Sequence, residues 1–294
     1  MGYISFAPGQ LDVKDMHQFM IGAISPRPIA FVSSINADGI NNLAPYSFFN
    51  ALSSNPPMLA FSCNLRPGNS PEKDTLRNIR EQGECVVNIV NEDIMYQMSV
   101  CSVEFPSNVS EFDKTGLTAL PSEKVKPFRV SESPVQMECT LHDIIALGNH
   151  AGASNLILCE IVKMHVNKNV MDAQLRRIDP QKLKVVGRLG RSNYVKVKGD
   201  NIVELYQPIR PVCVGYDGLP TQIKRSRFFT GNDLGKLASL INLPNEGDVR
   251  AYMEEQNIKG IHDVEFYHRK AKSLLDENLK VEAIKMAMIA ELSH

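Results

Sequence analysis

Residues suited to binding an anion lie at the predicted start of a helix. Lys73, Asp74 and Thr75 precede an amphipathic segment that ends at Gly83. The amide groups of a helix N-terminus, the helix dipole, a threonine hydroxyl and a lysine charge together favour a phosphate group. The alternative interpretation is an ordinary helix cap beside a solvated lysine, and such caps are common. The triplet alone allows both interpretations.

Three serine hydroxyls lie on the two arms of a predicted hairpin. Ser33 and Ser34 precede an Asp38-Gly39 pair, which is a strong hairpin signal, and Ser47 follows it. Hydroxyls on strands are often merely exposed. Because paired strands bring their side chains close together, we expect these hydroxyls and nearby backbone amides to converge on one ligand.

Aromatic residues surround the last of these serines. Tyr46, Phe48 and Phe49 lie next to Pro45 and Ser47. Such residues more often belong to a core than to a ligand site. Beside aimed polar groups, however, they could form the walls for a flat ring, and a flavin needs that combination of apolar walls and a few hydrogen-bonding groups.

Other catalytic patterns are weak or absent. The histidines show no metal-ligand spacing, and the six cysteines contain no C-x-x-C pair, so we expect no metal site. No G-x-S-x-G element is present to support hydrolysis. His150 is the best candidate catalytic residue because it lies in the glycine-containing loop 148–152, although a structural or solvent-exposed role is the simpler interpretation.

Composition narrows the class of protein. The 294 residues include 32 basic and 33 acidic side chains, so the net charge gives no reason to expect nucleic acid as the main partner. No basic, apolar leader and no apolar run of membrane-spanning length is present, so we expect a cytoplasmic protein without a membrane partner.

The elements that would position these residues are mostly short strands. Two helices are expected among them, one from Asp74 or Thr75 to Gly83 and one over residues 92–101. Many strands and few helices favour a mainly β (α+β) fold, a β-barrel with helical insertions. The expected strands cover residues 29–35, 40–49, 58–63, 85–90, 135–141 and 155–166.

The pattern changes near Pro208. We expect residues 187–194 to form a loop that closes the strand-rich region. Beyond it, residues 233–243, 248–257 and 273–292 show helical periodicity. The chain is therefore expected to divide into a domain over residues 1–207 and a helical C-terminal extension over residues 208–294.

Four segments, in this order and spacing, resemble a known family. They are Ser25-Pro-Arg-Pro-Ile-Ala-Phe-Val-Ser-Ser34, Asp38-Gly39 followed by Asn42-Leu-Ala-Pro-Tyr-Ser-Phe-Phe49, Lys73-Asp-Thr-Leu-Arg-Asn78, and Gly187-Arg-Leu-Gly190 with Tyr194. Over about residues 15 to 207 the chain resembles the flavin reductase-like proteins of the FMN-binding split-barrel fold. Within that family it is similar to the branch of flavoredoxins and the reductase components of two-component monooxygenases.

The resemblance implies a homodimer with one FMN per subunit. It implies that Lys73, Asp74 and Thr75 face the phosphate, with Arg66 as a further candidate. It places His150 beside the nicotinamide site and Arg188 in the late loop of the FMN site. The residues that it places around the isoalloxazine ring and the ribityl chain are Ser33, Ser34, Asn42, Ala44, Tyr46, Ser47, Phe48 and Phe49.

The sequence departs from the family pattern at two places. The stretch from Arg66 to Glu72 is longer than in the family, and the helical tail is not part of the family core. The resemblance therefore implies no role for that tail.

Three functions are consistent with these residues. The first is reduction of bound FMN by NADH or NADPH, in which the protein stacks the two rings and tunes the flavin by hydrogen bonds. The second is an FMN protein that exchanges electrons with a monooxygenase or another acceptor protein. The third is an interaction protein whose FMN pocket is degenerate.

Overall fold

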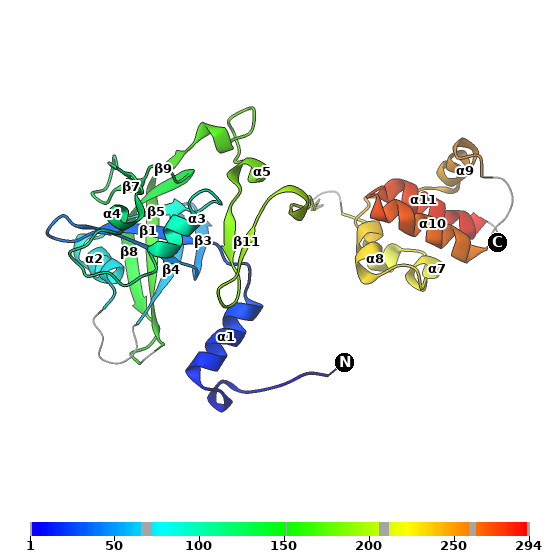
Figure 1. Ribbon diagram of the computed structural model, residues 1–294. Helices are drawn as coiled ribbons and strands as arrows, with labels where there is room; N and C mark the ends of the chain where they lie inside the picture. The colour runs from blue at the N-terminus through cyan, green and yellow to red at the C-terminus, as the bar shows by residue number, and fades with distance from the viewer. Residues whose placement is uncertain (1, 66–71, 151, 206–211, 259–262, 293–294) are drawn as a thin grey trace. The chain divides into compact units, whose positions relative to one another are not determined.

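The computed structural model describes residues 2–65, 72–150, 152–205, 212–258 and 263–292. The chain forms two compact units, Met1–Val203 and Glu204–His294, which are described separately below (Figure 1). The expected boundary between residues 207 and 208 lies outside the described residues.

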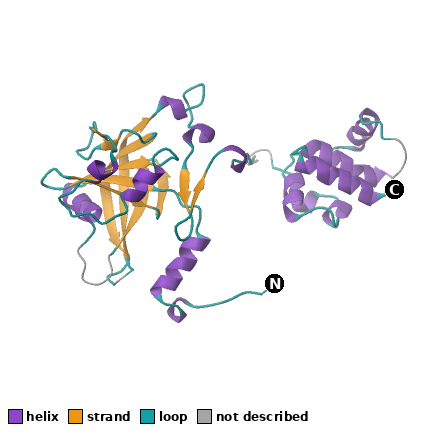
Figure 2. Ribbon diagram, in the orientation of Figure 1, coloured by secondary structure: helices purple, strands orange, loops and turns teal. Residues whose placement is uncertain are grey.

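A seven-stranded antiparallel sheet forms the centre of the first unit (Figure 2). The strand order is β2-β1-β5-β8-β9-β4-β3. The predicted mainly β fold is confirmed, and so is the hairpin, because β1 and β2 pair around a turn in which Gly39 has a φ of 82°. The strands are β1 (Ala30–Ile35), β2 (Asn41–Tyr46), β3 (Phe49–Ser54), β4 (Pro57–Asn64), β5 (Glu84–Ile89), β8 (Val135–Ala146) and β9 (Ser154–Val166).

The two edge strands of this sheet are consecutive in the chain. β2 ends at Tyr46 and β3 begins at Phe49, so only Ser47 and Phe48 connect the opposite edges. Two residues can span that connection only if the sheet curls until its edges meet, which makes it a barrel that is split at this point. The predicted single strand over residues 40–49 is therefore wrong, because the chain changes sheet edge inside it.

Alternation along the strands gives the sheet two apolar faces. Val32 in β1 belongs to a core that also contains Phe61 and, from helix α2 (Asp74–Gln82), Leu76 and Ile79. Phe31 belongs to a second core on the other face. The alternation of β1 thus assigns neighbouring residues to opposite sides of the sheet.

Helix α2 agrees with its prediction. It begins at Asp74, and Gly83 caps its C-terminus with a φ of 70°. The predicted helix over residues 92–101 is shorter, α3 (Met95–Val100). Residues 187–194 are not a simple loop, because β10 (Val186–Arg188) and β11 (Tyr194–Lys196) form a hairpin there.

The remaining elements of the first unit are short, except for the 11-residue helix α1. They are η1 (Pro8–Gln10), α1 (Val13–Ala23), α4 (Glu111–Thr115), β6 (Ala119–Leu120), β7 (Arg129–Val130), η2 (Lys168–Val170), α5 (Pro180–Leu183), β10 (Val186–Arg188), β11 (Tyr194–Lys196) and η3 (Gly199–Asn201).

The second unit is helical, as predicted. Residues 273–292 do not form one helix, because the chain turns between α10 and α11 where Asn278 has a φ of 64°. The unit has its own apolar core, which includes Leu237, Leu275 and Ile284. Its helices are α6 (Gly215–Gly218), α7 (Thr221–Lys224), α8 (Gly231–Ala238), α9 (Glu246–Glu255), α10 (Val264–Asp276) and α11 (Lys280–Leu292).

Two observations concern the described residues as a whole. None of their helices combines the length and the apolar composition that a membrane span requires. They also contain no group of three potential metal ligands.

Candidate functional site

Two neighbouring pockets form a groove where the barrel is split. Each has a volume of about 190 Å³, and they share a wall made of Pro45, Tyr46 and Lys73. One pocket is lined by carboxylates from Asp74, Glu104 and Glu111 and is called the acidic pocket below. The other is lined by the guanidinium groups of two arginines and is called the basic pocket.

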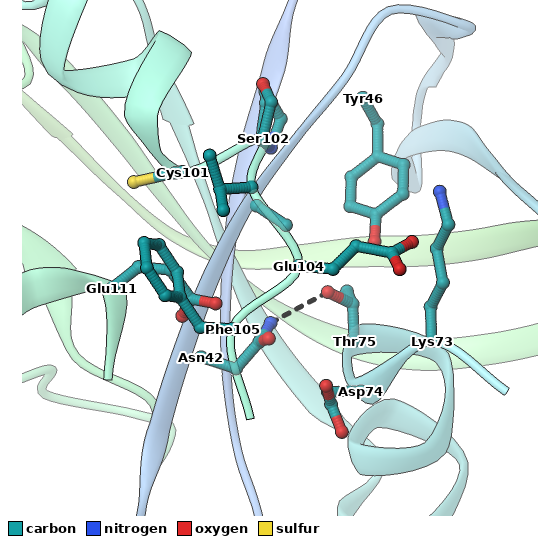
Figure 3. A pocket seen from close by; sticks show the side chains of 13 residues that line it. Asn42, Tyr46, Lys73, Asp74, Thr75, Cys101, Ser102, Glu104, Phe105 and Glu111 are labelled. Atoms are coloured by element: carbon teal, nitrogen blue, oxygen red, sulfur yellow. Dashed lines mark hydrogen bonds between the residues drawn. The ribbon is translucent and has the colours of Figure 1, made fainter. Parts of the chain in front are cut away.

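The floor of the acidic pocket carries a cluster of amides and hydroxyls. Asn42 Nδ2 donates to Thr75 Oγ1 at 2.8 Å (Figure 3), and it also donates to Ser34 Oγ at 3.3 Å. Asn78 Nδ2 also donates to Ser34 Oγ, at 3.2 Å, and Asn78 Oδ1 is buried without a partner in the described part of the chain. The cluster connects β1, β2 and α2, so the sheet edge and the helix start are held in register.

The carboxylates of this pocket are held by different partners. Asp74 accepts hydrogen bonds from Arg77 and from Ser107 Oγ. A Glu111 carboxylate oxygen accepts the Leu43 backbone N–H at 2.8 Å. Burial raises the pKa of Glu111, although this hydrogen bond opposes the shift. The Arg77 guanidinium therefore offsets the charge of Asp74, and burial disfavours the charged form of Glu111.

Tyr46 and Lys73 separate the two pockets. Tyr46 is buried, and burial together with the adjacent Cys63 thiol raises its pKa, so the hydroxyl stays protonated. Lys73 occupies the N-cap position of α2, and its Nζ lies 5.8 Å from the centre of the Tyr46 ring. Lys73 and Asp74 point in opposite directions from the helix start (Figure 3).

The basic pocket is built from several segments that are distant in the sequence. Ser47 and Phe48 come from the connection between the sheet edges, His17 from α1, and Arg188 from the end of β10. Phe48 packs beside the His17 ring at a centroid distance of 6.1 Å. The pocket therefore combines one aromatic wall with cationic groups.

Arg27 holds these segments together. Its Nη1 donates to the backbone carbonyls of Ile21 at 2.7 Å and Ile24 at 2.8 Å, and its Nη2 donates to Leu189 at 3.1 Å. Its backbone N–H and C=O both pair with Arg188 at 2.9 Å. Burial, followed by the charge of Arg188, lowers the pKa of the Arg27 guanidinium.

The groove brings together most of the residues that the sequence suggested. The acidic pocket is lined by Asn42, Ala44, Tyr46, Lys73, Asp74 and Thr75 among them. The basic pocket is lined by Tyr46, Ser47, Phe48, Lys73 and Arg188. Arg66 lies outside the described residues.

The expected convergence of the hairpin serines is wrong for Ser33. Ser33 and Ser34 are consecutive on β1 and point to opposite faces of the sheet. Ser34 joins the polar cluster beneath the groove, whereas Ser33 is fully buried and donates to the Phe128 carbonyl. Phe49 packs against the core and lines neither pocket.

His150 lies apart from the groove lining. It is exposed in the loop between β8 and β9, where its carbonyl accepts the Ala153 N–H at 2.9 Å. It lines neither pocket of the groove. A catalytic role for His150 stays a prediction.

Sequence analysis missed several lining residues. Arg27 lies inside the Ser-Pro-Arg-Pro segment, where an arginine flanked by prolines was the available signal. Glu111 and His17 reach the groove only through tertiary contacts, and no local pattern marks them.

Known proteins are similar to the first unit of this chain. The family model of the flavin reductase like domain matches residues 22–179, so the helical second unit lies outside the match. An uncharacterized protein of Aquifex aeolicus is 36% identical over 197 residues, which are 67% of this chain and 97% of that protein.

Solved structures extend the similarity to the fold. Nitrilotriacetate monooxygenase component B from Bacillus cereus is 33% identical, with a TM-score of 0.64 over 70% of this chain and 99% of that one. A split-barrel protein from Shewanella frigidimarina shares the fold at 24% identity, with a TM-score of 0.59 over 70% of this chain and all of that one (100%). The split-barrel fold expected from the resemblance is thereby confirmed, and the chain belongs to the flavin reductase-like domain family.

Proposed function

We propose that the chain binds FMN in the groove and is an NAD(P)H-dependent flavin reductase. The observation that carries this proposal is the combination of groups that line the two halves of the groove. A flat apolar side at Pro45 and Phe48 adjoins a cluster of hydroxyl and amide groups at Asn42 and Thr75, with Lys73 between them. A flavin mononucleotide presents groups of the same three kinds: a ring, a polyhydroxylated chain and a phosphate.

The donor set of the groove fits that ligand. Asn42 and Thr75 supply groups that hydrogen-bond hydroxyls, and Lys73 at the start of α2 supplies a positive charge beside backbone amides of the helix N-terminus. Carboxylates close to a phosphate would weaken binding. The Arg77 guanidinium forms an ion pair with Asp74, which also accepts from Ser107, so part of this cost is offset.

The residues of the groove then take distinct roles. Phe48 and Pro45 would hold the ring and exclude water from it, while Ser47 lies within reach of its polar edge. Bound FMN would supply the acceptor for a hydride that NADH or NADPH donates. Polar groups aimed at the ring edge would stabilise the charge that develops there.

His150 is proposed to help place the nicotinamide. Its exposed position in the β8–β9 loop supports a contact with an incoming reactant rather than with FMN itself. His150→Gln is expected to slow flavin reduction severalfold and to leave FMN affinity unchanged. Equal reduction rates in the two proteins, measured at saturating NADH and NADPH, would remove His150 from the mechanism.

The proposal is tested on the purified full-length chain. We expect a yellow protein, or a colourless one that binds added FMN, with fluorescence quenching as the binding signal. Anaerobic stopped-flow mixing with NADH and then NADPH should bleach the flavin absorbance with at least one donor. Free FMN at the same concentration is the control for non-enzymatic reduction.

Two results would contradict the proposal in different ways. Tight FMN binding without bleaching by either nicotinamide would indicate an electron-transfer protein that serves a protein partner. No FMN binding at all would indicate a degenerate pocket. The expected homodimer is a separate prediction, which light scattering after size-exclusion chromatography tests.

A further inference from the structure

Charge is divided unevenly along the groove. The acidic pocket contains three carboxylates and Lys73, whereas the described lining of the basic pocket contains Arg27, Lys73 and Arg188 and no carboxylate. No carboxylate of the described chain forms an ion pair with Arg27 or Arg188. The two halves of one groove therefore favour ligand groups of different charge.

Arg27 is unusual because it is a buried cation without a carboxylate partner among the described residues. Only 5% of its surface is exposed, and the groups that its guanidinium contacts are neutral: three backbone carbonyls, Ser47 Oγ at 3.4 Å, and the Phe48 ring at 5.7 Å from the ring centre. Carbonyls satisfy the hydrogen bonds of a guanidinium but do not neutralise it, and buried charges are normally paired. The site therefore has capacity for an anion.

Arg188 adds a second positive charge to the same pocket. Its guanidinium donates to Tyr194 Oη and to the Arg191 carbonyl, and it stacks on the Tyr194 ring at 4.6 Å from the ring centre. These contacts hold it in place with neutral partners, and it repels Arg27, which contributes to the lowered pKa of Arg27. Two cations held side by side are stabilised when an anion binds between them.

We propose that Arg27 and Arg188 form an anion site for a phosphate or carboxylate group at the basic end of the groove. Arg27 fixes the pocket walls, and the half-buried Arg188 carries the accessible charge. Planar guanidinium groups suit both oxyanions because they donate two parallel hydrogen bonds. The site rests on the geometry of the groove and does not require the proposed reductase activity.

The anion has two possible sources with the same chemistry. If FMN lies with its phosphate at Lys73, as proposed above, the basic pocket receives an anionic group of the second reactant, a nicotinamide dinucleotide or an organic acid. If FMN lies in the reverse direction, the pocket receives the phosphate of FMN itself. Comparing FMN with riboflavin distinguishes these sources, because riboflavin lacks only the phosphate.

The test compares Arg188→Met with Arg188→Lys, which keeps the charge. Arg27 is not substituted, because losing three carbonyl contacts could unfold the pocket. Arg191→Met is the matched control, since Arg191 lies on the same hairpin and lines neither half of the groove. Calorimetry measures the binding of inorganic phosphate and benzoate to the full-length protein with and without FMN, and fluorescence measures the binding of FMN and riboflavin.

We expect Arg188→Met to weaken binding of at least one of these anions by about tenfold, the loss typical of one charge-assisted hydrogen bond. Arg188→Lys should recover part of it, and Arg191→Met should bind as the wild type does. Loss of FMN affinity with riboflavin affinity unchanged identifies the FMN phosphate. Loss of phosphate or benzoate affinity in the FMN-loaded protein, with FMN affinity unchanged, identifies the second reactant.

Unchanged affinities in Arg188→Met for FMN, phosphate and benzoate would overturn the anion site, as would an equal loss in Arg191→Met. Failure of the proposed function gives a different result. In that case the wild type would not bind or reduce FMN, yet phosphate or benzoate binding would still depend on Arg188.

Discussion

Asn42 donates a 2.8 Å hydrogen bond from Nδ2 to Thr75 Oγ1, and this bond joins an edge strand of the barrel to the first turn of α2. Thr75 is only 1% exposed, so the bond is shielded from water. Because α2 also carries Lys73, the position of the lysine charge depends on this contact between two segments that are distant in the sequence.

Removing the Thr75 hydroxyl should weaken both the fold and the site. Thr75→Val keeps the shape of the side chain but leaves the Asn42 donor without its acceptor, which costs about 1 to 3 kcal/mol in the free energy of unfolding. Urea unfolding measures this loss. We expect FMN affinity to fall by about tenfold, and Thr75→Ser to retain most of both properties. A Thr75→Val protein with wild-type FMN affinity would exclude the hydroxyl from the site.

Lys73 should bind FMN through the negative charge of its phosphate. Lys73→Met is expected to reduce FMN affinity by about tenfold and to weaken its dependence on salt, because a charge-assisted contact with the phosphate is lost. Riboflavin affinity should stay the same. Lys114→Met is the control, since Lys114 also lies over an aromatic ring, that of Phe105, but does not line the groove. A similar loss in riboflavin binding would contradict a phosphate role.

Glu111 should make the first unit pH-dependent. Burial raises its pKa above the ordinary 4.5, so protonation favours the folded state. This contribution is fully present below pH 4.5 and is lost as the pH rises through the raised pKa of the folded state. Glu111→Gln keeps an acceptor for the Leu43 N–H and cannot ionise, so its stability should vary less with pH.

The measurement for Glu111 is urea unfolding of both proteins between pH 4.5 and 8. Relative to Glu111→Gln, the wild type should lose on the order of 1 kcal/mol for each unit by which its pKa is raised. If the free energy of unfolding varied with pH equally in the two proteins, burial would not raise the pKa of Glu111. FMN should bind Glu111→Gln at least as tightly as the wild type at pH 8, because one negative charge beside the phosphate is removed.

His268 should make the second unit sensitive to acid. It is 2% exposed, its Nε2 has no partner in the described chain, and burial lowers its pKa below the ordinary 6.5. Above pH 6.5 the ring is neutral in both states. As the pH falls below 6.5, the unfolded state binds the proton more readily, so the stability of the unit decreases until the pH reaches the lowered pKa of the folded state.

Hydrogen exchange of α10, corrected for the intrinsic pH dependence of exchange, measures this effect in the full-length chain. Protection should fall between pH 7 and 5 in the wild type. It should change less in His268→Phe, which fills a similar volume beside Phe229 and removes the unpaired nitrogen. His142→Gln, an exposed substitution in β8, should behave as the wild type. An unchanged pH profile in His268→Phe would refute the prediction.

Features with a local cause could be predicted from the sequence. The hairpin follows from Asp38-Gly39, and α2 follows from its apolar spacing and its glycine cap. Features that depend on distant segments could not. The predicted strand over residues 40–49 is split between two sheet edges, and the predicted helical segment over residues 273–292 turns at Asn278.

The sequence by itself determined the mainly β fold with its helical extension, and the hairpin and helix start that supply part of the groove, because strand alternation, turn residues and helix caps act over a few neighbouring residues. Only the tertiary structure decided which side chains reach the groove. It turned Ser33 toward Phe128, brought Glu111 to the acidic half, and placed Arg27 beside Arg188 in the basic half. The curling of the sheet until its edges meet brings these distant residues together, and no pattern along the chain records that closure.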